Sequence, residues 1–184
     1  RYNHLMKKSI RNTMSKIILP VVVSVICSFT FYLPSAAFNP AQLEKLLETK
    51  ECVECDLRGA DLRKADLNNA MLKGTNFEEA ILHGANLTNA TLSRAILTGA
   101  DMRGAILKGA NLSNAKIDGA NLYGANLRVA NLYKADLRAA NLSGADLSAA
   151  NLGMINLSEA NLSWTVWNNG KTCAMGSMGE CEQE

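Results

Sequence analysis

The sequence is poor in the residues on which catalytic and metal sites usually depend. It has two histidines among 184 residues, His4 and His83, and neither accompanies a nucleophile motif or a phosphate-binding loop. Acid–base and nucleophilic catalysis both need several such groups placed together. We therefore expect no enzyme activity, no cofactor and no metal site.

Aromatic residues are also scarce, at 5% of the chain. A core with so few aromatic rings has to be filled by aliphatic side chains, and leucine and alanine are abundant. The length fits one domain. These features favour a single domain whose core is built from stacked leucine and alanine.

What the sequence does contain is one five-residue motif, repeated from Cys55 to Ser163. A large apolar residue, called position i below, recurs at every fifth position from Leu57 to Leu162, which makes 22 repeats. In a helix, five residues advance about 500°, so these side chains would wind around the cylinder. In a strand, side chains alternate, and a step of five would send successive leucines to opposite faces. The chain must therefore turn a corner in every repeat.

The other repeat positions support this interpretation. Position i−2 is mostly alanine, as expected of a crowded inward site, and position i−1 is Asp or Asn in 16 of the 22 repeats. Asp and Asn alternate freely there, which favours turn hydrogen bonding over an array of acids or metal ligands. Position i+2 is Gly or Asn in 12 repeats, which suits a turn with positive φ. The predicted inward core includes Leu57, Leu62, Leu67, Leu72, Phe77, Leu97, Leu112, Ile117, Leu137 and Leu157.

One repeat cannot bury its own leucine, so the coils must stack. The phrase A-(D/N)-L-x-x resembles the signature of the pentapeptide-repeat family, and the resemblance covers 55–164. It implies an all-β solenoid, a right-handed quadrilateral β-helix with four pentads per coil, in which residues twenty apart stack. The 22 repeats would form about 5.5 coils and, at a strand spacing of ~4.8 Å, a rod roughly 26 Å long.

Residues 1–37 have the pattern of a secretory signal peptide. Basic residues precede an apolar run over 17–33, and Ser35, Ala36 and Ala37 offer a cleavage site after Ala37. An uncleaved membrane anchor is the alternative, because this run of 17 residues is just long enough to span a bilayer. Without the leader, 14 Lys and Arg face 17 Asp and Glu, a net charge of −3.

Residues 38–54 are expected to cap the first coil. Asn39 is a good helix N-cap and Pro40 suits the first helical position. Leu43, Leu46 and Leu47 would share one face of this helix. We expect that face to cover the open end of the solenoid, which would otherwise be a bare sheet edge.

Four cysteines outside the leader occur as two close pairs, Cys52 with Cys55 and Cys173 with Cys181. In an exported protein this predicts two local disulfides, the second of which closes a tail cap over 165–184. A redox-active Cys-x-x-Cys motif and reduced buried thiols remain alternatives. A zinc site shared by both pairs is excluded, because the rod of roughly 26 Å separates them.

If residues twenty apart stack, Arg63, His83 and Arg103 form one column on the surface. Such a column could bind an anion or an acidic partner. Alternatively, Asp61 and Asp101, two residues before the arginines, neutralise it.

Two functions are compatible with the sequence. The first is a non-enzymatic exported structural or protein-interaction module, similar to the signal-bearing pentapeptide-repeat proteins of cyanobacteria and the thylakoid lumen. The second is a DNA-mimicking topoisomerase protector, which the resemblance implies to be cytoplasmic, strongly acidic and dimeric. Residues 53–167 hold 11 acidic and 11 basic side chains, which favours the first. We therefore expect a monomer in the periplasm or the thylakoid lumen, with an unknown protein partner, no nucleic acid, and no stable membrane insertion after signal cleavage.

Overall fold

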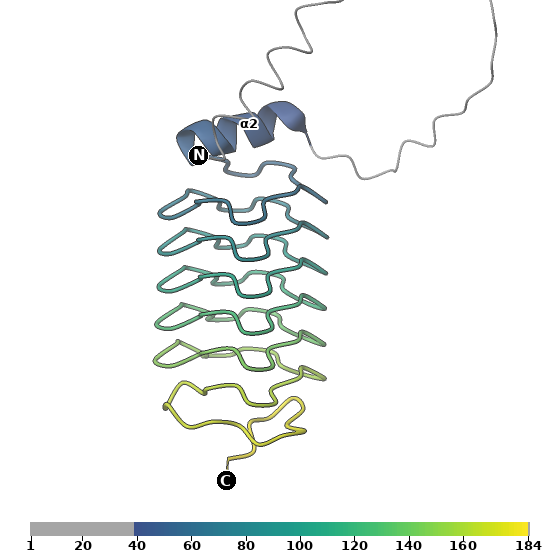
Figure 1. Ribbon diagram of the computed structural model, residues 1–184, viewed down its shortest axis with the longest axis vertical. Coiled ribbons are helices and arrows are strands. Elements are labelled where there is room, and N and C mark those ends of the chain that lie inside the picture. Colours follow the sequence, from purple (N-terminus) through teal and green to yellow (C-terminus); the bar gives the residue numbers. More distant parts are fainter. Residues whose placement is uncertain (1–38, 184) are drawn as a thin grey trace, which may run out of the picture. The chain divides into compact units, whose positions relative to one another are not determined.

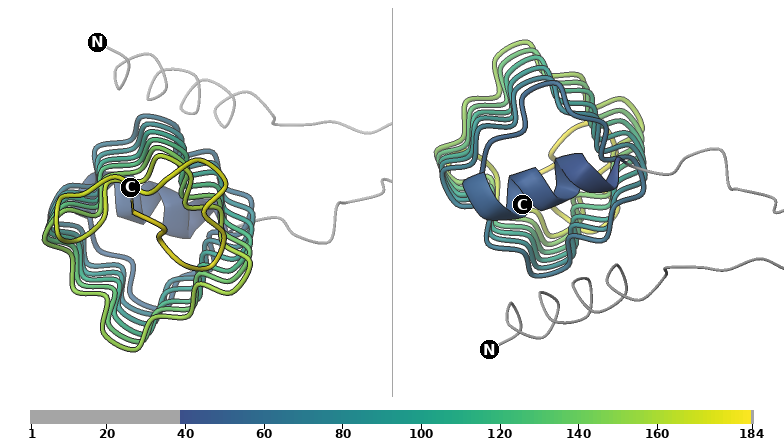
Figure 2. Two further views of the ribbon diagram at one scale, coloured as in Figure 1. Left: turned by 90° about the horizontal axis from the view of Figure 1, so that it is seen from below. Right: turned by 90° about the horizontal axis from the view of Figure 1, so that it is seen from above.

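The computed structural model describes residues 39–183, so the predicted signal peptide at 1–37 lies outside the described part. The described chain begins with helix α2 (Pro40–Thr49). After α2 the backbone descends in stacked coils (Figure 1). Viewed along the stack, each coil has the outline of a square with bulging corners (Figure 2).

The coils are joined by parallel β-bridges between residues twenty apart. The bridges run from Glu51↔Met71 to Asp146↔Val166 and fall on four sides of the coil. On one side, the Leu57 N–H donates to the Asn76 carbonyl at 2.8 Å, and the Asn76 N–H donates to the Cys55 carbonyl at 2.8 Å. Because each coil holds four pentads, every residue of the repeat lies above its equivalent in the next coil.

The corners are β-turns that re-aim the chain inward. In the first one, the Ala60 N–H donates to the Leu57 carbonyl at 3.1 Å. Position i+2 has positive φ in all 22 repeats, whereas the preceding position i+1 does not, as in a type II turn. Gly and Asn are favoured there for this reason. Ten repeats place another residue type in this left-handed conformation.

Val129 is the corner residue with the greatest expected strain, because it is β-branched and has φ 52°. Asn89, forty residues earlier in the same column, adopts φ 56° with a side chain that tolerates it. We expect Val129→Asn to raise the free energy of unfolding by about 1 kcal/mol, measured by urea denaturation. The reverse change, Asn114→Val at φ 57°, should destabilise the protein. If both variants were as stable as the wild type, a β-branched residue at this corner would not be strained.

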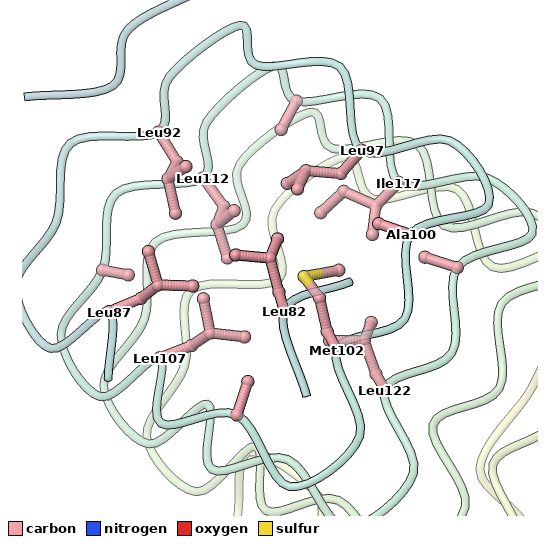
Figure 3. Packing of buried hydrophobic residues seen from close by; sticks show 14 of the residues in the cluster. Leu82, Leu87, Leu92, Leu97, Ala100, Met102, Leu107, Leu112, Ile117 and Leu122 are labelled. Atoms are coloured by element: carbon pink, nitrogen blue, oxygen red, sulfur yellow. The ribbon is translucent and has the colours of Figure 1, made fainter. Parts of the chain in front are cut away.

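The core is a set of stacked leucines separated by alanines. Figure 3 shows the large side chains pointing into the coil, with Leu92 above Leu112 and Leu97 beside Ile117. All ten predicted core residues are buried; Leu157, in the last coil, is 9% exposed and is the most exposed of them. Most alanines at i−2 are buried too, although Ala65 is only partly buried, and the fully buried Thr75 occupies the same position in its repeat.

Helix α2 lies across the opening of the first coil (Figure 2). Asn39 caps its N-terminus, where its Oδ1 accepts from the Ala41 N–H at 3.1 Å. The helix ends at Thr49, and its C-cap Lys50, in a left-handed conformation, donates its N–H to the Leu46 carbonyl. Leu46 is fully buried and Leu43 packs against the core, but Leu47 is 51% exposed. The prediction that Leu47 belongs to the covering face is wrong, because the side of α2 that contacts the coil is too narrow to include all three leucines.

The solenoid is one pentad longer at each end than the predicted range 55–164. Glu51 already bridges Met71, and Cys52 fills the inward position that leucine fills elsewhere. At the other end Val166 bridges Asp146, and Trp167 takes the large position of a further pentad. A pattern defined by leucine misses both pentads.

The tail crosses the open end of the last coil (Figure 2). Its antiparallel bridges include Asn161↔Met178 and Val166↔Thr172. The Leu162 N–H donates to the Ser177 carbonyl at 2.9 Å, a bond that a further coil would otherwise supply. Within residues 39–183, no helix has the length and apolar character that crossing a membrane requires.

Candidate functional site

The Asp and Asn side chains at position i−1 have a structural role at every corner. In all 16 cases the side-chain Oδ1 accepts a hydrogen bond from the backbone N–H two residues later, at 2.9–3.3 Å. An Asn amide makes this bond as well as an Asp carboxylate does. The free alternation of Asp and Asn in the sequence follows from this shared bond.

Four of these aspartates also bind an arginine two residues later, in what we call an Asp-x-Arg pair. Asp101 is typical: its two oxygens accept from Nε and Nη2 of Arg103 at 2.8 and 2.7 Å. This hydrogen bond to the guanidinium is the main reason why the pKa of Asp101 lies below its ordinary value of 3.8. The four pairs are Asp56–Arg58, Asp61–Arg63, Asp101–Arg103 and Asp136–Arg138.

The predicted basic column exists, and its charge is partly compensated. Asp61 bridges Ile81, and Ile81 bridges Asp101, so Arg63, His83 and Arg103 follow one another on one side of the solenoid. Each arginine is held by the aspartate of its own coil. The structure thus brings the three predicted residues together and also forms both of the neutralising contacts.

The lowered pKa values of these carboxyls predict an acid-sensitive stability. A carboxyl whose pKa is lower in the folded chain stabilises the fold above its unfolded pKa, and this stabilisation is lost as the pH falls through the folded value. We expect the melting temperature to decrease once the pH is lowered below about 4. Exposed ion pairs contribute little, so the slope should be shallow.

A variant with Asn at positions 56, 61, 101 and 136 is the matched control for this prediction. Asn keeps the Oδ1 contact to the backbone and loses the titrating group. The variant should melt close to the wild type at neutral pH and show a flatter acid limb. An identical acid limb in both proteins would assign the pH dependence to other carboxyls.

Both cysteine pairs form disulfides in the structure. Cys52 and Cys55 have a Cα–Cα distance of 5.3 Å, and Cys173 and Cys181 one of 5.0 Å. Cys55 points into the core, and it reaches Cys52 because Cys52 occupies the neighbouring inward position. The first disulfide therefore lies under helix α2, and the second closes the tail loop.

Other sites for chemistry are few in the part of the chain that the structure describes. An open groove of about 350 Å³ is lined by Asp118, Arg138 and Glu159 with smaller residues between them. Within 39–183, no three side chains of His, Cys, Asp or Glu are grouped to hold a metal ion. The exposed methionines of the tail, Met175 and Met178, carry no signal in the sequence, because their exposure depends on how the loop is folded.

The comparisons with known proteins place these coils in a family. The model of the pentapeptide repeats matches eight copies, over residues 51–89, 72–109, 85–124, 105–144 and 140–165. No protein in the curated set matches the chain.

Several solved structures are similar to this chain. A pentapeptide repeat protein from the thylakoid lumen of Arabidopsis thaliana is 24% identical, with a TM-score of 0.51, over 67% of this chain and 85% of that one. Rfr23, a pentapeptide repeat protein from the cyanobacterium Cyanothece 51142, is 33% identical over 70% and 98% of the two chains, with a TM-score of 0.35. QnrB1, a plasmid-mediated fluoroquinolone resistance protein, is 21% identical over 63% and 78%, with a TM-score of 0.22.

The Arabidopsis structure implies that the solenoid is a right-handed β-helix. The matched family segments together run from 51 to 165, which is well over half of the chain and nearly the whole stack of coils. The chain belongs to the pentapeptide repeat family.

Proposed function

We propose that the protein is an exported, non-enzymatic module that binds a protein partner through a side face of the solenoid. The observation that carries this is how the polar side chains are used: the i−1 residues hold the turns, and four arginines are fixed in Asp-x-Arg pairs. The interior is packed with leucine and alanine. The part of the molecule that remains available for binding is its rigid outer surface, on which side chains recur at regular spacing.

Export is supported by the leader-like pattern at 1–37 and by the two disulfides, since disulfides persist in oxidising compartments. We propose the periplasm or the thylakoid lumen. Sequencing the N-terminus of protein from its native host should give Phe38 as the first residue. A retained leader would instead make the protein a membrane-anchored solenoid.

The proposed binding face is the side that carries Arg63, His83 and Arg103. In each Asp-x-Arg pair the aspartate uses Nε and one Nη of the guanidinium, so Arg103 keeps further N–H donors for a partner. Lys64, at the adjoining corner, adds positive charge to the same side. These groups suit acidic side chains of a partner protein.

A face-specific comparison tests this proposal. The wild type, an Arg63→Ala/His83→Ala/Arg103→Ala variant and an Arg58→Ala/Arg138→Ala variant are used to capture partners from the native compartment. The control variant removes arginines of identical Asp-x-Arg chemistry from a different side. The same partner should be captured by the wild type and the control and lost by the first variant. Capture by all three, or by none, would overturn the proposed face.

DNA mimicry is not proposed for this chain. A DNA mimic has to present dense negative charge, whereas residues 53–167 balance 11 acidic against 11 basic side chains. The Asp-x-Arg pairs further reduce the negative electrostatic potential around four of these acidic side chains.

A further inference from the structure

The tail loop closed by Cys173 and Cys181 has an inverted burial pattern. Cys173 and Ser177 are buried, whereas Met175 and Met178 are 73% and 57% exposed. Neither methionine therefore serves as a core side chain.

The backbone of this loop is held by hydrogen bonds and a disulfide, so the positions of Met175 and Met178 along it are fixed. The Ser177 N–H donates to the Ala174 carbonyl at 3.3 Å, which closes a turn around Met175. Met178 then forms an antiparallel bridge with Asn161. The disulfide joins the two ends of the loop. Both thioethers thus project from one short, cross-linked segment attached to the last coil.

We propose that Met175 and Met178 together bind a soft monovalent cation, Cu(I) or Ag(I). Thioether sulfur is a ligand that selects soft metals over Ca²⁺, Mg²⁺ and other hard cations. Each methionine has three rotatable bonds, so a sulfur in the turn and one at the bridge three residues later can reach a common ion. The disulfide lowers the entropy lost on binding, because the loop is already ordered.

The surroundings of the loop also favour a cation. Residues 171–183 contain two acidic side chains, Glu180 and Glu182, against one basic side chain, Lys171. The backbone N–H of Trp164 donates to the Cys173 carbonyl at 3.1 Å, which ties the loop to the last corner of the solenoid. Negative charge raises the local concentration of cations.

Silver nitrate is the probe for the test, because Ag(I) needs no reductant that would open the disulfides. The full chain, kept in mild detergent, is labelled at its methionine methyl groups, and it is treated with an alkylating agent so that Cys27 in the leader cannot bind silver. The NMR signals of Met175 and Met178 should shift together and saturate at an equimolar amount of silver. The signal of Met71, exposed near the other end of the solenoid, should move only at a large excess.

Matched variants decide the outcome. Met178→Leu should weaken silver binding at Met175 by roughly tenfold or more, because one of the two ligands is lost. Met154→Leu, which changes an equally exposed methionine on another corner, should leave the affinity unchanged. The proposal is overturned if the Met175 and Met178 signals shift no earlier than that of Met71. It is overturned equally if Met178→Leu leaves the titration of Met175 unaltered. A thiol assay and a melting curve verify that each variant keeps its disulfides and its fold.

Discussion

Replacing Leu112 with alanine is expected to lower the free energy of unfolding by about 2–5 kcal/mol. Leu112 is 1% exposed and lies in a middle coil, where its column continues with leucines in the coils before and after it. Truncation leaves a cavity between two coils that the rigid β-bridges cannot close. Urea denaturation of the wild type and the variant measures the loss.

Ser113→Ala is the matched control, one residue further along the same pentad. Ser113 contacts Asn111 through its backbone N–H, at 3.1 Å, and alanine keeps that bond. Its side chain points outward, so the change should stay within about 0.5 kcal/mol. If both variants lost the same stability, the assignment of inward and outward positions would be wrong.

Removing the tail disulfide should have the second largest effect. The Cys173→Ser/Cys181→Ser variant frees a loop of nine residues, for which loop-closure entropy gives about 2–3 kcal/mol. The Cys52→Ser/Cys55→Ser variant frees four residues, and the same relation gives about 2 kcal/mol. Thermal melting should rank the two variants in that order.

Hydrogen exchange can separate a local effect from a global one. The amides of Leu162 and Trp164 donate to the tail, so their protection should fall first when its disulfide is removed. Amides of the middle coils should keep theirs. A greater loss in the Cys52→Ser/Cys55→Ser variant would contradict the ranking. A cross-link between Cys52 and Cys181 in a non-reduced digest would contradict the stacked coils themselves.

The five-residue period was enough to predict the stacked coils, because neither a helix nor a flat strand can bury residues spaced by five. It was also enough to place the aliphatic core, since positions i and i−2 both carry apolar residues. The helix start at Asn39 and Pro40 followed from the chemistry of helix ends.

Other features depend on three-dimensional contacts that the pattern does not contain. Cys52 and Trp167 fill leucine positions, and only the bridges of Glu51 and Val166 reveal this. Leu47 fits the helical pattern of the covering face as well as Leu46 does, yet the end of a coil is wide enough to bury only one of them fully.

The basic column was predicted with two alternatives, and the sequence could not choose between them. Spacing alone placed Arg63, His83 and Arg103 above one another, but the orientation of each guanidinium depends on side-chain torsions. The structure shows Arg63 and Arg103 held by Asp61 and Asp101. A partner on this face would therefore meet guanidinium groups whose direction is already fixed.

The twenty-residue spacing of the bridges also determines how this protein can change in length. Insertion or deletion of one complete coil moves the tail loop along the axis but leaves every surface column on its own side. A change of a single pentad instead rotates everything after it by a quarter turn. The basic column would then continue into the side chains of a neighbouring face, and the tail loop would lie over a different corner. Duplications within the gene are thus compatible with a conserved binding face only in multiples of one coil.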